Sequence, residues 1–365
     1  MKKLIASLMA IAVLVWVAGP LMVVANQTVD TSLVKSSVGG AAPIVKVKWE
    51  MDGGYASLLG TDAQTTAGAQ FMPSGKYKVN KTIGICAVAT DPDGVADIDS
   101  VYGDVFYPTN VYLGPDHEAD RQGCGQMVGT ECRMTKLDKS VGIDLICDKI
   151  RSKNSNLPTW YDGYNYDEIC KADGELMKET AYVYCCDKVL SYEDPSGDYK
   201  VLVFAQDKNG ADSNYLENQM RYLPLTAFET DFNQVVYGDV KLNTHKIING
   251  NLAFAPTVNG DTMATVRNVG NTRLQMSVSQ DDMGLGQTGT TWNVKYDGRV
   301  GSDAAWSYYW PNATKYLNDP LNLSETNEMD FSVDISKFPP TGTSFIGKMT
   351  LGAISVAHLT VCPQD

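Results

Sequence analysis

The sequence has few of the patterns that mark an enzyme. Only three histidines occur among its 365 residues, and none stands in the HExxH or CxxC–H arrangement of a zinc site. No G-x-S-x-G motif is present to carry a serine nucleophile. We therefore expect a protein that is not an enzyme. A third and weaker interpretation, an extracellular hydrolase, would have to use carboxylates such as Asp162, Asp167 and Glu168.

Helix-forming runs and positive charge are also scarce. Long segments rich in Ala, Leu, Glu and Lys are missing, whereas tyrosine (19), glycine (32) and proline (15) are plentiful, which favours strands and turns. The 30 Lys and Arg residues are outnumbered by 43 Asp and Glu residues, which gives a formal net charge of −13. A surface this acidic repels phosphate backbones, so we expect no nucleic-acid partner, and it suits divalent cations.

The N-terminus has the pattern of a targeting segment. Lys2 and Lys3 precede an apolar run over residues 4–25, and Val23-Val24-Ala25 has the small-residue pattern that a signal peptidase cleaves. The run is also long enough for an uncleaved membrane anchor, which is the alternative. Both interpretations place the rest of the chain outside the cell. Residues 26–43 are rich in Ser, Thr, Gly and Ala and read as a flexible stalk.

Cysteines and glycosylation sequons agree with export. The eight cysteines form an even set that suits disulfide bonds in an oxidising compartment: Cys86, Cys124, Cys132, Cys147, Cys170, Cys185, Cys186 and Cys362. Four N-x-S/T sequons predict glycosylation at Asn26, Asn80, Asn312 and Asn322. We therefore expect an extracellular or cell-surface glycoprotein.

Short alternating segments separated by turn signals predict an all-β chain with two Ig-like β-sandwich domains. The first covers residues 44–228, and the second covers residues 229–365. Within the first, a Cys-rich insertion at about 108–180 contains the predicted helices, near 138–152 and 166–179. Such an insertion needs disulfides because its own core is small.

Two segments of the first domain carry a family resemblance. They read TIGICAVATDPDGVADIDSV (82–101) and PSGDYKVLVFAQDKNGADS (195–213). The second follows the pattern G-x-Y-x-V-x-V-x-A-x-D-x-x-G at Gly197, Tyr199, Val201, Val203, Ala205, Asp207 and Gly210. Both resemble the B–C and F–G regions of Ig-like and PKD-like modules in archaeal and bacterial surface proteins. The resemblance implies a sandwich fold and no particular activity.

Two acidic turns form a candidate calcium site. In an Ig-like topology the B–C and F–G loops emerge at the same end of the sandwich. These loops contain Asp91, Asp93 and Asp97 in one case, and Asp207, Asn209 and Asp212 in the other. Converging oxygen ligands are what Ca²⁺ requires, although the same residues favour tight turns without any metal.

An aromatic cluster in the second domain is a candidate ligand-binding or interface surface. It consists of Trp306, Tyr308, Tyr309 and Trp310. Flat rings suit stacking on sugars or burial at a protein interface, and the alternative is that some of them face the core.

The sequence as a whole favours a structural or adhesive cell-surface protein: a surface-layer component, a filament subunit or an adhesin. Its partners would be copies of itself or other surface proteins, with glycans as a possible ligand, and it would touch a membrane only through an uncleaved N-terminus. A secreted carbohydrate- or ligand-binding protein that uses the aromatic cluster is the alternative.

Overall fold

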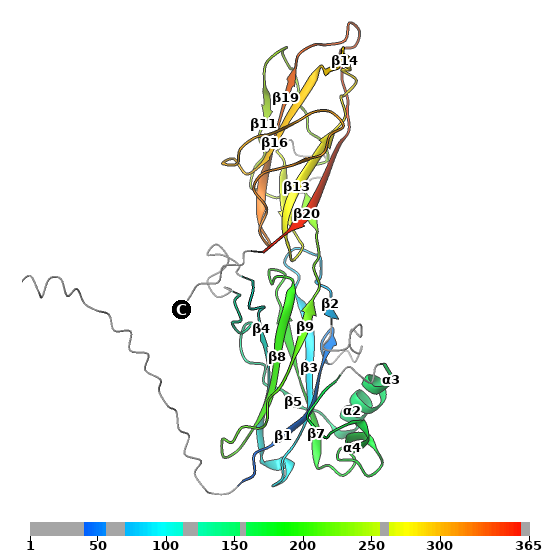
Figure 1. The fold of residues 1–365 in the computed structure, drawn as a ribbon, viewed down its shortest axis with the longest axis vertical. Helices are drawn as coiled ribbons and strands as arrows, with labels where there is room; N and C mark the ends of the chain where they lie inside the picture. Colours follow the sequence, from blue (N-terminus) through cyan, green and yellow to red (C-terminus); the bar gives the residue numbers. More distant parts are fainter. Residues whose placement is uncertain (1–39, 56–69, 112–122, 154–157, 256–262, 359–365) are drawn as a thin grey trace, which may run out of the picture. The chain divides into compact units, whose positions relative to one another are not determined.

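A computed structural model of the protein describes residues 40–55, 70–111, 123–153, 158–255 and 263–358 (Figure 1). The predicted signal peptide or anchor and the sequon at Asn26 lie outside these residues. The described residues confirm the predicted fold class, because they fold mainly into β-sheets that pack as sandwiches. None of the helices in these ranges is long and apolar enough to cross a membrane.

The first sandwich is built from two sheets. The five-stranded sheet has the order β5-β7-β3-β1-β6, and its strands are β1 (Ile44–Asp52), β3 (Lys81–Thr90), β5 (Thr135–Lys136), β6 (Thr159–Trp160) and β7 (Ala181–Leu190). The four-stranded sheet has the order β2-β9-β8-β4, and its strands are β2 (Gln70–Phe71), β4 (Ile98–Phe106), β8 (Gly197–Asp207) and β9 (Leu216–Tyr222).

Alternating residues of β8 fill the core between these sheets. Tyr199, Val201 and Val203 are fully buried, while the residues between them are partly exposed. The Tyr199 hydroxyl donates a hydrogen bond to the Pro195 carbonyl oxygen at 2.7 Å. A buried tyrosine at the start of this strand, bonded to the backbone just upstream, is a hallmark of Ig-like sandwiches. The structure thus supports the fold that the residues of this strand predicted.

The insertion covers the outer face of the five-stranded sheet. Its short helical segments are α2 (Lys139–Ile143), the π-helical η3 (Asp144–Ile150), α3 (Arg151–Lys153) and α4 (Tyr166–Cys170) (Figure 1). Leu145 and Ile146 pack with Trp49 of β1 and Val88 of β3 in a second core on that face. This explains why β3 is an uninterrupted apolar run: a strand covered on both faces needs no polar side.

The predicted helix over 166–179 is wrong beyond Cys170. Asn165 caps the start of α4 by accepting from the backbone N–H groups of Asp167 and Glu168. After Cys170 the chain turns, and Gly174 packs against the end of the helix. A Cβ atom at Gly174 would lie 2.6 Å from the Ile169 carbonyl oxygen, so the turn requires glycine there.

The second sandwich has its own core. One sheet has the order β10-β12-β19-β16-β17, with β11 also paired to β19, and the other has the order β18-β13-β20. The strands are β10 (Phe228–Thr230), β11 (Lys246–Ile248), β12 (Thr265–Asn268), β13 (Arg273–Gln280), β16 (Val294–Val300), β17 (Ser307–Tyr309), β18 (Lys315–Tyr316), β19 (Thr326–Ile335) and β20 (Met349–Val356), with a small hairpin of β14 (Gln287–Thr288) and β15 (Thr291–Trp292). Phe331 and Val333 of β19 alternate into this core.

Candidate metal site and exposed aromatic surface

The two acidic turns of the first sandwich meet, as the topology predicted. The turn after β3 carries Asp91, Asp93 and Asp97, whose carboxylate oxygens can all lie within 4.8 Å of one another. The backbone N–H of Lys208, in the turn after β8, donates to the Asp97 carbonyl oxygen at 2.9 Å. This bond ties the two turns together, and Asp207 lies close enough for its charge to act on Asp91.

In each of the two buried carboxylates, Asp91 and Asp207, only one oxygen accepts a hydrogen bond within the described residues. Asp91 Oδ1 accepts from the Asp93 N–H at 2.8 Å, and Asp207 Oδ1 accepts from the N–H groups of Asn209 at 2.9 Å and Ala211 at 2.7 Å. The Oδ2 atoms of Asp91 and Asp207 are buried and have no hydrogen-bond partner among the residues that the structure describes. The two residues are 5% and 2% exposed. Leaving such an atom unpaired is costly, so a cation fits this cluster.

Repulsion among the carboxylates also favours a bound cation. Burial raises the pKa of Asp91, and the carboxylates of Asp97, Asp93 and Asp207 raise it further, against the opposing hydrogen bond from the Asp93 N–H. Three carboxylates converge in a partly buried setting, with a fourth from Asp207 nearby, and they form an all-oxygen donor set that matches the preference of Ca²⁺. The residues therefore fit a calcium ion.

The other two predicted ligands differ from each other: Asn209 faces the cluster and Asp212 does not. The Asn209 side-chain amide faces the same space as Asp93 and Asp207, since atoms of all three lie 3.2–3.3 Å from where a Gly40 Cβ would stand. Asp212 instead accepts from Gln206 Nε2 and from the Tyr215 hydroxyl, each at 3.1 Å. Both of its oxygens thus have partners outside the cluster, and Asp212 serves as a matched control for the others.

Sequence reasoning missed the contribution of the chain entry. The Ala41 backbone N–H donates to Asp93 Oδ2 at 2.5 Å, and Gly40 lies against Asp207 and Asn209. Both residues fall within the segment that composition predicted to be a flexible stalk. In the sequence, the one sign that the chain packs closely against the acidic turns here is that residue 40 is a glycine, which has no side chain to keep them apart.

The predicted aromatic cluster divides into an exposed strip and one buried ring. Tyr308 and Trp310 are 58% and 41% exposed, and Trp306 is half-buried beside them. Tyr309 is 3% exposed and packs on Tyr296 in the core, with ring centroids 5.4 Å apart. The prediction of a ligand or interface role is therefore wrong for Tyr309, because β17 alternates and turns that ring inward.

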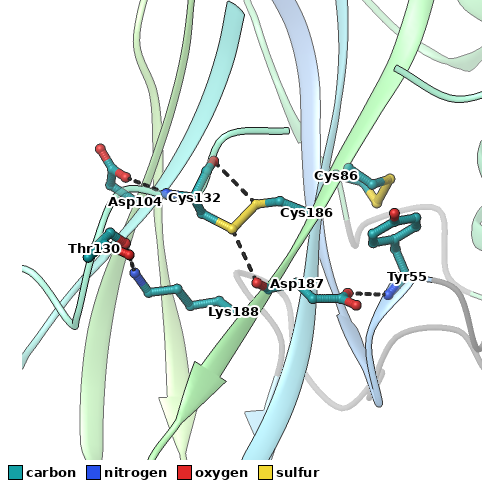
Figure 2. The surroundings of a disulfide bond; sticks show 9 residues. Tyr55, Cys86, Asp104, Thr130, Cys132, Cys186, Asp187 and Lys188 are labelled. Carbon is teal, nitrogen blue, oxygen red and sulfur yellow. Dashed lines mark hydrogen bonds between the residues drawn. A yellow bond between two sulfur atoms is a disulfide. The ribbon is translucent and has the colours of Figure 1, made fainter. Parts of the chain in front are cut away.

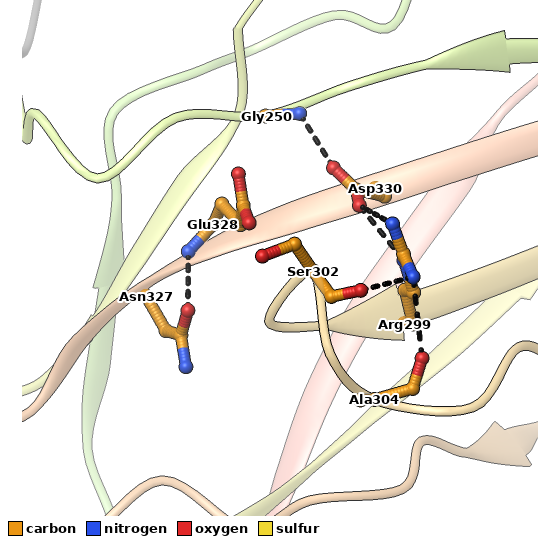
Figure 3. Close-up of polar contacts among 7 residues, drawn as sticks. All are labelled: Gly250, Arg299, Ser302, Ala304, Asn327, Glu328 and Asp330. Carbon is orange, nitrogen blue, oxygen red and sulfur yellow. Dashed lines mark hydrogen bonds and ion pairs between the residues drawn. The ribbon is translucent and has the colours of Figure 1, made fainter.

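Cations flank the exposed aromatic strip. Lys295 Nζ lies 4.7 Å from the centre of the Tyr308 ring, and the Arg299 guanidinium lies 4.6 Å from that of Trp306. Figure 3 shows how Arg299 is fixed: its Nε donates to the buried Asp330 Oδ2 at 2.8 Å, and its Nη1 donates to the carbonyl oxygens of Ser302 and Ala304. The loop before β17 is thereby held against the second sandwich, with Trp306 at its end.

Two of the predicted glycosylation sites are exposed, although the Asn80 Oδ1 atom accepts from the Tyr192 N–H at 3.2 Å. Asn80 and Asn312 are exposed, and Asn312 lies in the turn just after Trp310. Asn322 is half-buried, and its Oδ1 accepts from Arg273 Nε at 3.0 Å. The carboxylates considered for hydrolysis, Asp162, Asp167 and Glu168, are exposed, and Asp167 pairs with Arg151 at 3.1 Å.

Three disulfides hold the first sandwich and its insertion together. They join Cys86 to Cys185 across β3 and β7, Cys132 to Cys186, and Cys147 to Cys170 within the insertion. Around Cys132 the insertion is also held by hydrogen bonds, from the Cys132 N–H to Asp104 Oδ1 at 3.3 Å and from Lys188 Nζ to the Thr130 carbonyl oxygen at 2.5 Å (Figure 2).

A fourth disulfide is predicted between Cys124 and Cys362. Cys124 is disulfide-bonded, and no cysteine in the described ranges is free. The three bridges above use six of the chain's eight cysteines and leave Cys124 and Cys362, of which Cys362 lies outside the described residues. Non-reducing peptide mapping is expected to recover a Cys124–Cys362 linked peptide, whereas a free thiol at Cys362 in secreted protein would contradict the pairing.

Comparison with known proteins gives no family assignment, since no family profile and no curated protein sequence matches the chain. Three similar solved structures come from bacterial proteins. The C-terminal domain of the Streptococcus pyogenes antigen I/II-family protein AspA is 12% identical, with 86% of this chain and 96% of that chain covered and a TM-score of 0.22.

The other two are more distant in sequence. The C-terminal domain of the Streptococcus agalactiae AgI/II polypeptide BspA is 10% identical, with 86% and 96% covered and a TM-score of 0.20. The CupB6 tip adhesin from Pseudomonas aeruginosa is 7% identical, with 85% and 94% covered and a TM-score of 0.22. Similarity at this level carries no functional argument.

Proposed function

We propose that this chain is an extracellular structural or adhesive protein of a cell surface, with a non-enzymatic role. The observation that carries the proposal is the exposed aromatic strip, formed by Trp306, Tyr308 and Trp310 on one face of the second sandwich. Exposed Trp and Tyr side chains in a row are enriched where proteins bind one another. The disulfides and the predicted signal segment support a location outside the cell.

The partner that fits the strip best is a second copy of this chain. Lys295 and Lys315 place their ammonium groups 4.7 Å and 6.0 Å from the centre of the Tyr308 ring, whereas Arg299, beside Trp306, is paired with Asp330. The chain as a whole has a formal net charge of −13. An aromatic strip lined by cations is therefore complementary to the acidic surface that another copy offers.

Sedimentation analysis of the protein purified without its first 25 residues tests this. We expect self-association at micromolar concentration, and we expect Tyr308→Ala and Trp310→Ala each to weaken it by at least about tenfold, because central aromatic residues contribute most to such contacts. Tyr215→Ala is the matched control, since Tyr215 is 54% exposed on the first sandwich. A protein that stays monomeric, or an equal loss in the Tyr215 variant, would contradict the proposal.

Carbohydrate binding is the second candidate, and the same strip favours it. Tryptophan and tyrosine rings stack on the apolar faces of sugars. A monomeric protein that binds a glycan through Trp310, with binding abolished by Trp310→Ala and retained by Tyr215→Ala, would favour this candidate over self-association.

Calcium is the proposed ligand of the first sandwich. Asp91, Asp93 and Asp97 supply converging carboxylates, and Asp207 supplies one nearby. The support for an ion is that the Oδ2 atoms of Asp91 and Asp207 have no hydrogen-bond partner among the described residues. Its role would be structural: the ion would join the turns after β3 and β8 where the chain enters the sandwich at Gly40.

A further inference from the structure

A lysine, a glutamate and an asparagine meet in the interior of the first sandwich. Lys48 and Glu50 are two residues apart on β1, so their side chains leave the same face of the strand. Both are 0% exposed. Asn218, on β9 of the opposite sheet, is half-buried against them. The other face of β1, with Val47, Trp49 and Met51, packs under the insertion.

The three side chains form a closed ring of contacts. Lys48 Nζ donates both to Glu50 Oε1 and to Asn218 Oδ1. The Asn218 side-chain Nδ2 donates to Glu50 Oε2 at 3.1 Å. The lysine nitrogen therefore touches the carbonyl group of the amide, while the two oxygens of one carboxyl group contact the lysine nitrogen and the amide nitrogen.

Burial makes this lysine unusual. Desolvation lowers the pKa of the Lys48 amine, which opposes the stabilisation of its charged form by Glu50 and Glu217. A lysine held as a neutral amine is a nucleophile, whereas an ammonium group is not. A permanent ion pair in this position would also bear the large cost of desolvating two charges. The position therefore favours chemistry in which both charges disappear.

We propose that Lys48 and Asn218 form an intramolecular isopeptide bond, and that Glu50 is the catalytic residue. The neutral Nζ attacks the Asn218 Cγ atom, and a carbon–nitrogen bond forms as the carbonyl π-bond opens. Glu50 already holds the proton that made the amine neutral; it delivers this proton to Nδ2 through Oε2 as it takes the next proton from Nζ through Oε1. The Cγ–Nδ2 bond then breaks, ammonia leaves and the carbonyl re-forms. The step conserves every atom and needs no oxidant, metal or co-substrate.

Proximity supplies most of what this step needs. Amine and amide react slowly in water, but a pair held in contact inside a folded core reacts as a single molecule. Glu50 stands between the atom that loses a proton and the atom that must gain one, which is the geometry of general acid–base catalysis. Folding itself would assemble the site, because β1 and β9 come from opposite sheets.

The bond would join the two ends of the first sandwich. Lys48 and Asn218 are 170 residues apart in the sequence. Lys48 lies on the first strand of the sandwich and Asn218 on the last one before the second sandwich begins. A stretching force applied along the chain would be transmitted from β1 to β9 through this bond, so the residues between them would bear no force. This property suits a surface protein under tension, although the bond does not depend on the function proposed above.

Mass spectrometry of the intact, reduced and denatured protein tests the proposal. We expect the mass to fall short of the sequence mass by one ammonia molecule. We also expect trypsin to leave Lys48 uncut and to release one branched peptide that contains both Lys48 and Asn218. The branched peptide is decisive, because an Asn-Gly pair such as Asn209-Gly210 can also lose ammonia by cyclisation. Separate, unmodified peptides from correctly folded protein would overturn the proposal.

Two variants separate the catalytic role from a packing role. Glu50→Gln keeps the size of the side chain and removes its proton transfer, so the variant is expected to fold yet to keep its full mass. Asn218→Ala removes the electrophile and gives the same mass result. Under reducing conditions each is expected to unfold about 10–20 °C below the parent protein, since a closed loop this long is lost. A branched peptide formed at an unchanged rate in Glu50→Gln would remove Glu50 from the mechanism.

Discussion

Calcium is expected to raise the unfolding temperature of the protein by about 5–10 °C when the ion is present at a hundredfold excess over its dissociation constant. The reason is the cluster of Asp91, Asp93, Asp97 and Asp207. These carboxylates repel one another without an ion, and two of their buried oxygens have no hydrogen-bond partner within the described part of the chain. An ion that binds the folded state alone stabilises it by mass action. Calorimetry in calcium and in chelator measures the shift.

Conservative variants make this test specific. Asp207→Asn keeps the shape of the side chain and removes one charge, so the calcium shift should be lost while the calcium-free protein becomes no less stable. Asp212→Asn lies in the same turn and removes the same charge, yet Asp212 bonds to Gln206 and Tyr215 and should leave the shift intact. Equal shifts in both variants, or a melting curve indifferent to calcium and chelator, would exclude the site.

Mechanical unfolding is expected to show the second large effect. With the disulfides reduced and the protein held by its two ends, the first sandwich should release almost none of the chain between Lys48 and Asn218. That segment spans 170 residues. Without the proposed cross-link it would extend by about 600 Å. The expected difference is therefore larger than the extension of any other single element of the fold.

Single-molecule force spectroscopy measures this directly. The Glu50→Gln variant provides the control, because it should fold in the same way but release the full length when pulled. If the parent protein also releases about 600 Å under reducing conditions, Lys48 and Asn218 are not joined.

The convergence of the acidic turns could be predicted from sequence, because it follows from topology. The buried β3 run, the alternating β8 strand and the two turns define neighbouring elements of an Ig-like sandwich. Tyr199 matches the strand pattern named from the sequence, and in the structure it is buried and its hydroxyl donates to the Pro195 carbonyl oxygen. The exposed aromatic strip could be predicted from sequence only in part, since alternation along β17 leaves Tyr308 exposed and buries Tyr309.

The Lys48–Glu50–Asn218 site could not be predicted in this way. An alternating strand such as β1 normally has its charged side in water, but here Lys48 and Glu50 are buried because the four-stranded sheet lies against that side. Asn218 is one of many polar residues in its region, and only the pairing of β9 in the opposite sheet brings it to Lys48. Gly40 was missed for a similar reason, because composition describes a segment and not what it touches.

Electron microscopy with a gold-labelled antibody tests the central claim, that this is a cell-surface structural or adhesive protein. On intact, unpermeabilised cells that produce the chain, we expect the antibody to label the outer surface, and we expect purified protein to form assemblies that the Trp310→Ala variant does not form. Labelling confined to permeabilised cells, together with purified protein that shows no assemblies, would contradict the claim.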